Sequence, residues 1–377
     1  MKKILLIAAL AVFMGSCTKQ TGTTIKIDAA NYDAETINLA WVADGEYKVE
    51  PLTLVDGKAE ITVDLPEGTD IRLASLDSRN GIQMDRGMIP GPGFSFYAEN
   101  GKINISFDAD KWPEVTIKGG KLSSDVNNYW KEMGPLQGKS FEATRRMVAQ
   151  REAGEQPTPD PESTNVREQM EKVQDKFIAA NPNSLLSLDL LNGKFMQSDL
   201  LDFESQFNKL GQNVRETKKG KAIAEKIAQA KKMLPGNPAP DFTKKDKDGN
   251  TVTLAGLKGK YVMIDFWGTW CGPCRASHPH LIQLHKKYSP LGVEFINIAQ
   301  EGGSDARPKW LQAIEDDGLT WTQILNDEGM EECDVVTLYG IQAFPTKVLI
   351  DPQGVLVATW IGDTPEVDAK LLEIFGE

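Results

Sequence analysis

The feature that most constrains this chain is a pair of cysteines, Cys271 and Cys274, between an apolar run and a helical stretch. The apolar run Tyr261–Trp267 predicts a buried parallel strand, and residues 275–288 predict a helix. The sulfur of Cys271 then lies at the helix N-terminus, where unpaired N–H groups and the helix dipole favour a thiolate. Because the thiolate is the reactive form of cysteine, the motif predicts thiol–disulfide exchange.

Two cysteines separated by two residues also form half of many zinc sites, which need two more ligands at a workable spacing. His278 and His280 follow closely. A metal held by both cysteines and one histidine is therefore the alternative interpretation of the motif. We expect no metal here, and no cofactor other than the redox-active disulfide between Cys271 and Cys274 itself.

Residues 262–274, which read VMIDFWGTWCGPC, resemble thioredoxin, and the wider region resembles the extracytoplasmic TlpA/ResA-like disulfide reductases. The other segments that carry this resemblance are Gly236–Phe242, Asp248–Gly249, Leu257–Lys260, Phe344–Thr346 and Leu349–Gly354. The resemblance covers roughly residues 234–377. It implies an α/β thioredoxin fold for this region and the activity of a thiol–disulfide oxidoreductase.

The resemblance also implies a role for each matched residue. Cys271 would be the attacking thiol, exposed at the helix start, and Cys274 the buried thiol that resolves the mixed disulfide. Asp265 is a charged residue inside an apolar strand, and burial would raise its pKa to a range that suits proton transfer with Cys274. The alternative for Asp265 is a purely structural carboxylate at a strand end.

Four further residues would form the substrate-binding surface. Pro345 matches the cis-proline that faces the dithiol in this family, and it would expose the backbone beside Phe344 for pairing with a substrate strand. Trp270 and Pro273 would form an apolar platform around the sulfurs.

The sequence departs from the family one helical turn after the dithiol. The usual glutamate three residues after the second cysteine is replaced by Ser277, and His278 follows it. His278 could take over the acid–base function of that glutamate near neutral pH. The alternative is a histidine that simply lies on the flank of the helix.

The first residues predict a targeting signal, not part of the fold. Lys2 and Lys3 precede an apolar stretch, and Met14–Cys17 resembles a bacterial lipobox. We expect residues 1–17 to be a lipoprotein signal peptide, with Cys17 lipidated, and a plain secretory signal is the alternative. The residues after Cys17 favour the outer membrane of a Gram-negative cell over the inner membrane.

The net charge of −12 argues against nucleic acid as a partner and against electrostatic binding to anionic lipid. The expected partners are disulfide-containing protein substrates, an unidentified electron donor, and the membrane through the lipid anchor. With only four cysteines in all, the chain lacks a disulfide framework, which again favours a catalytic pair.

Two regions precede the thioredoxin-like one. From 23 to 120 apolar and polar residues alternate, which predicts an antiparallel β-sandwich of about seven or eight strands, with a hairpin at Asp56–Gly57. From 121 to 233 the apolar period is helical, which predicts a helical segment. Residues 234–240 would be a linker.

The predicted function is therefore reduction of protein disulfides outside the cytoplasm. The alternatives are a disulfide oxidase or isomerase, or a redox-silent binding lipoprotein anchored at the surface. Cys333 is left over; it is either a partly buried apolar residue or a site of regulatory or intermolecular disulfide formation.

Overall fold

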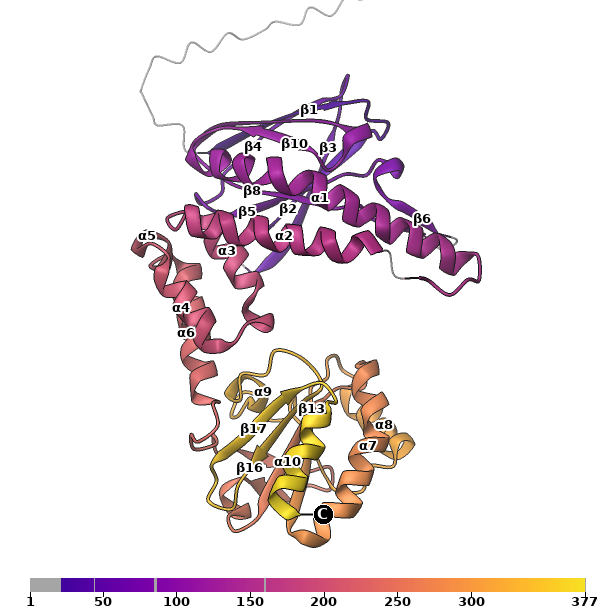
Figure 1. Ribbon diagram of the computed structural model, residues 1–377, viewed down its shortest axis with the longest axis vertical. Helices are drawn as coiled ribbons and strands as arrows, with labels where there is room; N and C mark the ends of the chain where they lie inside the picture. The colour runs from indigo at the N-terminus through magenta and orange to yellow at the C-terminus, as the bar shows by residue number, and fades with distance from the viewer. Residues whose placement is uncertain (1–21, 44, 85–86, 159–160, 377) are drawn as a thin grey trace, which may run out of the picture. The chain divides into compact units, whose positions relative to one another are not determined.

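The computed structural model describes residues 22–43, 45–84, 87–158 and 161–376 (Figure 1). The expected signal peptide and the expected lipidation of Cys17 lie outside these residues. The described chain divides into two compact units, with the division between Thr217 and Lys218. Among the described helices, none combines the length and the apolar character that a bilayer crossing requires.

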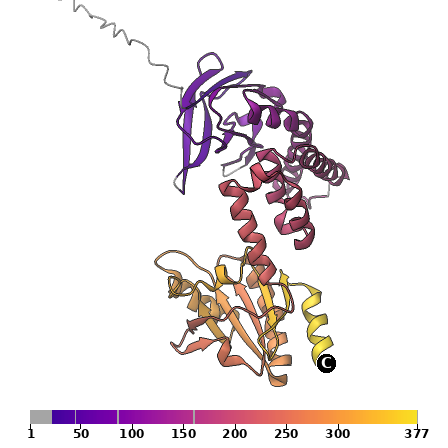
Figure 2. The same ribbon diagram turned by 90° about the vertical axis from the view of Figure 1, so that its left-hand side faces the viewer.

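Two four-stranded sheets build the first unit (Figure 2). The strand order in one sheet is β10 (Val115–Lys118), β9 (Gly101–Asp108), β1 (Thr23–Ala30), β4 (Lys58–Val63). The order in the other is β3 (Glu46–Thr53), β2 (Thr36–Ala43), β5 (Asp70–Ala74), β8 (Phe94–Tyr97). A small hairpin of β6 (Ile82–Met84) and β7 (Gly87–Ile89) is added. The alternating apolar residues of both sheets face one shared core, as a period of two dictates.

The prediction of a β-rich first region is confirmed, but one detail of it is wrong. Strands β1 and β9 pair in parallel, so the sandwich is not wholly antiparallel; such pairing between distant strands leaves no local pattern. Asp56 and Gly57 do form a tight turn with positive φ at both residues. Val55 and Lys58 pair antiparallel across it, as in a hairpin, although the strands that continue from them belong to different sheets.

The helices of the first unit extend the same core. They are α1 (Lys121–Glu152), α2 (Pro161–Ala180), α3 (Leu185–Gly193), α4 (Leu200–Lys209) and α5 (Gln212–Arg215), with the 3-10 turn η3 (Phe195–Gln197). Trp130 of α1 packs edge-on against Phe94 with ring centroids 5.1 Å apart, and Phe177 of α2 packs against Tyr129. Buried Glu99 accepts hydrogen bonds from the first turn of α1, which satisfies the helix N-terminus.

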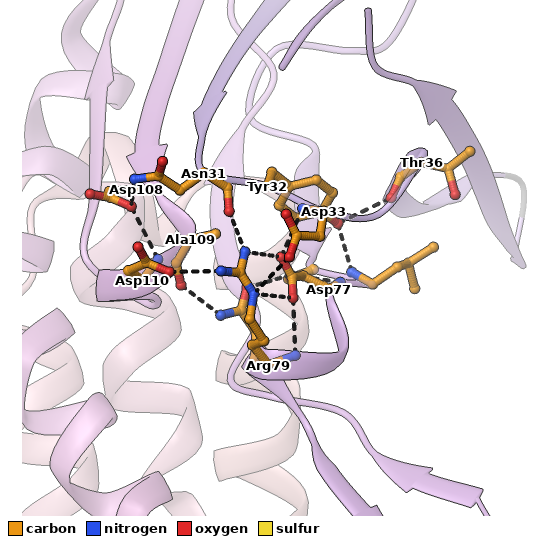
Figure 3. A network of polar contacts seen from close by, with 12 residues as sticks. Asn31, Tyr32, Asp33, Thr36, Asp77, Arg79, Asp108, Ala109 and Asp110 are labelled. Atoms are coloured by element: carbon orange, nitrogen blue, oxygen red, sulfur yellow. Dashed lines mark hydrogen bonds and ion pairs between the residues drawn. The ribbon is translucent and has the colours of Figure 1, made fainter. Parts of the chain in front are cut away.

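A polar network fastens the loops of the first unit (Figure 3). It joins the β1–β2 loop to two short 3-10 helices, η1 (Ser78–Asn80) and η2 (Ala109–Lys111). The Arg79 guanidinium pairs with Asp77 at 2.7 Å and with Asp110 at 2.8 Å, and Asp33 lies 3.4 Å from it. The hydrogen bonds from Arg79 lower the pKa of the buried Asp77 to about 2. One guanidinium thus holds three carboxylates from three loops, which gives the network a structural role.

The second unit has the mixed five-stranded sheet of the thioredoxin fold. Its strand order is β15 (Thr322–Leu325), β14 (Val293–Ala299), β13 (Tyr261–Trp267), β16 (Thr346–Ile350), β17 (Leu356–Ile361). The central strand β13 pairs in parallel with β14 and antiparallel with β16, so the expected buried parallel strand is parallel on one side only. The helices are α6 (Lys218–Lys232), α7 (Gly272–Tyr288), α8 (Ala306–Asp317), α9 (Val335–Leu338) and α10 (Pro365–Phe375). The 3-10 turns are η4 (Ala255–Leu257) and η5 (Ser289–Leu291).

The two faces of this sheet carry separate apolar cores, because side chains alternate along each strand. Helices α7, α8 and α10 cover one face, and α9 with the segment around Phe242 covers the other. A small hairpin of β11 (Thr243–Lys245) and β12 (Thr251–Thr253) precedes the sheet. In the segment expected to be a linker, the amides of Gly236 and Ala239 donate to carbonyls in and beside β17, so this segment is attached to the unit.

Candidate active site

The two cysteines lie where β13 gives way to α7, as predicted. Cys271 is the N-cap of α7, and its sulfur accepts a hydrogen bond from the amide of Cys274 at 3.2 Å. The two sulfurs form a disulfide with an S–S distance of 2.02 Å. The exposed Pro273 stands in the first turn of the helix, where its missing N–H costs nothing. The helix start therefore presents a redox-active pair at the positive end of the helix dipole.

Cys271 is more exposed than Cys274, as expected, but it is much less exposed than expected. Cys271 keeps 5% of its surface exposed and Cys274 none. The prediction of an exposed Cys271 is wrong for the disulfide form, because its side chain belongs to the same apolar cluster as Met263 and Trp267. Its sulfur is also bonded to the enclosed sulfur of Cys274. Of the two, only Cys271 retains a surface that a second thiol could reach.

Trp270 is the most exposed aromatic residue beside the disulfide, at 62%. Its indole stands edge-on to the ring of Phe344 at 5.5 Å, and its Nε1 donates to the carbonyl of Gln300 at 2.9 Å. Gly268 is required below it, because a Cβ there would lie 2.6 Å from Trp270 Nε1. Trp270 and Phe344 thus form an apolar surface next to Cys271, a pairing that the sequence analysis did not predict.

The loop before Cys271 is held by a residue that the sequence analysis missed. Glu301 follows β14, and its carboxylate accepts from the Thr269 amide at 2.6 Å and from the Thr269 hydroxyl at 2.7 Å. Asp327 in turn accepts from the Glu301 amide at 2.8 Å. No sequence motif marks Glu301, because it lies in the loop after the neighbouring strand.

The peptide bond between Phe344 and Pro345 is cis, as the resemblance implied. Pro345 is buried, and its carbonyl accepts from the amide of Gly362 at 2.8 Å. Phe344 is half-buried and contacts both apolar cores of the sheet.

Asp265 is sealed in the centre of the sheet with 1% of its surface exposed. One carboxylate oxygen lies 3.2 Å from Lys347 Nζ, and the other accepts from the side-chain amide of Asn297 at 3.2 Å. Burial raises the pKa of Asp265, although the charges of Lys347 and His278 oppose the rise. Within the described residues, neither cysteine sulfur is a hydrogen-bond partner of this carboxyl group.

The sequence analysis missed both partners of Asp265. Lys347 is fully buried and lies directly opposite Asp265 on β16, and Asn297 lies opposite it on β14. Trp321 fixes Asn297 by donating to its side-chain oxygen at 2.8 Å. A lysine within the apolar strand Thr346–Ile350 was a usable signal, because burying an ammonium is costly without a counter-charge.

The two departures from the family pattern lie on the first turns of α7. Ser277 is buried and donates to the Cys274 carbonyl at 2.8 Å. His278 is 1% exposed, and its Nδ1 lies 2.7 Å from Asp317, which also pairs with Arg275. Burial opposes the effect, but the hydrogen bonds from Arg275 and His278 lower the pKa of Asp317. His278 is therefore an enclosed residue of α7 that is paired with a carboxylate.

The remaining candidates lie apart from this chemistry. No group of three potential metal ligands of the kind His, Cys, Asp or Glu occurs in the described part of the chain, so the zinc alternative gains no further ligand there. Cys333 is a free, partly buried cysteine that packs on the core beneath the opposite face of the sheet.

Comparison with known proteins agrees with this geometry. The profile of the Redoxin family matches residues 234–373. The thiol–disulfide oxidoreductase ResA of Bacillus anthracis is 35% identical over 137 residues, which cover 36% of this chain and 75% of that protein. ResA of Bacillus subtilis is 30% identical over 131 residues, or 35% of this chain and 69% of that protein.

Among solved structures, the thioredoxin domain of a thiol–disulfide oxidoreductase from Bacteroides vulgatus is 30% identical. The match covers 38% of this chain and 98% of that chain, with a TM-score of 0.34. The resemblance predicted from the dithiol and its flanking motifs is confirmed by the curated relatives. Through its C-terminal third, the chain belongs to the family of ResA-type thiol–disulfide oxidoreductases.

Proposed function

We propose that the protein reduces protein disulfides outside the cytoplasm by thiol–disulfide exchange through Cys271 and Cys274. The observation that carries the proposal is the asymmetry of the pair at the helix start: only Cys271 retains exposed surface. The dipeptide between the cysteines, Gly272–Pro273, is that of thioredoxin, which is strongly reducing at about −270 mV. This dipeptide favours a reductase over an oxidase or an isomerase.

The exchange proceeds in two steps. The thiolate of Cys271 attacks a substrate disulfide, forms a mixed disulfide and releases one substrate thiolate. Cys274 then loses its proton to Asp265, attacks the sulfur of Cys271 and releases the second substrate thiolate. The raised pKa of Asp265 supports its role as the acid and base for Cys274. The two electrons end on the substrate, and the protein ends as the disulfide.

We further propose that Trp270, Pro273, Phe344 and Pro345 dock the substrate. The exposed indole of Trp270 and the ring of Phe344 offer an apolar surface, and Pro273 is exposed beside the sulfurs. Aromatic residues of this kind dominate the free energy of protein recognition when a partner covers them.

The proposed location is the periplasmic side of the outer membrane, with Cys17 carrying the lipid. The lipobox-like Met14–Cys17 supports the lipid anchor, and Thr18 and Lys19, which follow Cys17, favour the outer membrane over the inner one. We also propose the division into a β-domain at 23–120, a helical segment at 121–233 and the redox domain at 234–377. A Cys17→Ala variant should move from the membrane to the soluble fraction.

Reduction of insulin disulfides by the protein lacking residues 1–17 tests the proposed activity. We expect turnover with dithiothreitol as the electron donor, and none with Cys271→Ser. If the two proteins are equally inactive, the redox-silent binding lipoprotein becomes the better interpretation. A trapping variant, Cys274→Ser, should retain its physiological substrates as mixed disulfides and so identify them.

A further inference from the structure

The buried ammonium of Lys347 lies between two carboxylates from different parts of the second unit. Its Nζ is 3.2 Å from Asp265 on β13 and 3.9 Å from Asp363, which follows β17. Lys347 is fully buried, and its Nζ makes no hydrogen bond with any described residue. The ammonium has three donors and lies within ion-pair distance of both carboxylates, more closely to Asp265 than to Asp363.

The row of charges continues from Asp363 to the surface. His280 Nδ1 lies 2.9 Å from Asp363, and His280 Nε2 lies 3.1 Å from Asp368 on α10. Asp265 and Lys347 are sealed, with 1% and 0% of their side chains exposed, whereas Asp363, His280 and Asp368 reach the surface, with 33%, 28% and 52% exposed. A sealed carboxyl group is thereby connected to solvent through groups that each carry or accept a proton.

We propose that Lys347, Asp363 and His280 form the path by which the proton of Asp265 reaches solvent during exchange. This inference rests on the proposed function, in which Asp265 takes a proton from Cys274. In each cycle the ammonium of Lys347 gives one proton to Asp363 and regains one from Asp265. The proton on Asp363 then passes to His280 and to water, so that Lys347 is unchanged at the end.

The other charged groups around Asp265 offer a competing path through His278. His278 Nε2 is buried without a hydrogen-bond partner among the described residues, and its Nδ1 is committed to Asp317, which Arg275 also holds. His278 acts on Asp265 only through its charge. Ion-pair distances of 3.2 Å and 3.9 Å at Lys347, followed by 2.9 Å between Asp363 and His280, favour the path to His280.

The kinetic test compares single variants in the pH dependence of insulin reduction. Asp363→Asn and His280→Ala should slow exchange roughly tenfold near pH 8, where more of His280 is neutral and can accept the proton, and much less at pH 6. Added imidazole should restore the rate of His280→Ala, since a small proton carrier can replace the missing group. A Glu373→Gln variant, which removes an exposed carboxylate from α10 outside the row, serves as the matched control and should behave as wild type.

The outcomes separate the inference from the proposed function. If wild-type protein reduces insulin but Asp363→Asn matches it at every pH, the path is wrong and the function stands. A loss confined to His278→Asn would assign the path to His278 and overturn the proposal. If wild-type protein itself has no activity, the proposed function fails.

A second measurement is independent of turnover. The ¹³C resonance of the Asp265 carboxyl group, identified by its absence in Asp265→Asn, reports the pKa of this group in the oxidised protein. Asp363→Asn should lower that pKa, because it removes a neighbouring negative charge. The ammonium of Lys347 would then have Asp265 as its only carboxylate partner of the two. An unchanged pKa would show that Asp363 and Asp265 are not linked through Lys347.

Discussion

Removal of the buried ammonium is the sharpest test of how Asp265 is accommodated. Lys347→Met keeps the approximate length and volume of the side chain but leaves the carboxyl group of Asp265 without its cation. Asp265 is 1% exposed, and among the described residues only Asn297 donates a hydrogen bond to it. Without Lys347, keeping this carboxyl group ionised would therefore carry a large desolvation cost. We expect the carboxyl group to fold in its protonated form instead.

The magnitude follows from proton linkage. Burial raises the pKa of Asp265 above that of an aspartate in the unfolded chain, and loss of the Lys347 charge in folded Lys347→Met would raise it further. Between the two pKa values the folded protein binds one proton more than the unfolded protein, so its stability falls as the pH rises. For one proton the slope is at most about 1.4 kcal/mol per pH unit, so the variant should lose up to about 4 kcal/mol between pH 4 and pH 7. Wild-type protein should lose less, since its carboxylate is paired with Lys347.

Urea unfolding at several pH values measures this loss. Hydrogen exchange of the amides in β13 and β16 ensures that the transition observed belongs to the second unit. The double variant Asp265→Asn/Lys347→Met is the control, and it should lack this slope, because the carboxyl group of Asp265 that causes it has been removed. If the free energy of unfolding of Lys347→Met is the same at pH 4.5 and pH 7, the reasoning on the buried pair is refuted.

Three further predictions concern other parts of the molecule. Iodoacetamide should alkylate Cys271 of the reduced protein before Cys274, since only Cys271 retains exposed surface; mass spectrometry of the peptides would expose the reverse order. The pKa of Asp77 is lower in the folded protein than in the unfolded chain, so wild-type protein should lose about 1–2 kcal/mol of stability as the pH falls from about 4 to 2. Asp77→Asn should lack this contribution at every pH. Acid titration of the first unit by circular dichroism measures the difference, and identical unfolding curves for the two proteins would contradict the prediction. Trp270→Ala should leave the melting temperature unchanged and raise the KM for insulin about fivefold, whereas an unaltered KM would remove Trp270 from the docking surface.

The local part of the site could be predicted from the sequence. An apolar run, two cysteines and a helical stretch determine where the disulfide lies, because strand, turn and helix are contiguous. Asp265 was evident for a similar reason, as the one charged residue in an apolar strand.

The partners of these residues could not be predicted with the same ease. Lys347 and Asn297 meet Asp265 through strand register, and Glu301 and Asp317 come from loops and helix ends that only the folded sheet brings close. Local sequence patterns do not show which residues of two distant strands lie opposite each other. The parallel pairing of β1 with β9 in the first unit was missed because it too joins strands that are far apart in the sequence.

The central claim is that Cys271 and Cys274 exchange a pair of electrons as one unit. A redox titration tests it most directly: the protein is equilibrated at a series of glutathione or dithiothreitol ratios, alkylated and weighed by mass spectrometry. We predict a reversible two-electron transition in which both cysteines become alkylated together, with a midpoint near that of thioredoxin at about −270 mV. Cysteines that change independently, or a pair that is never oxidised reversibly, would contradict the account.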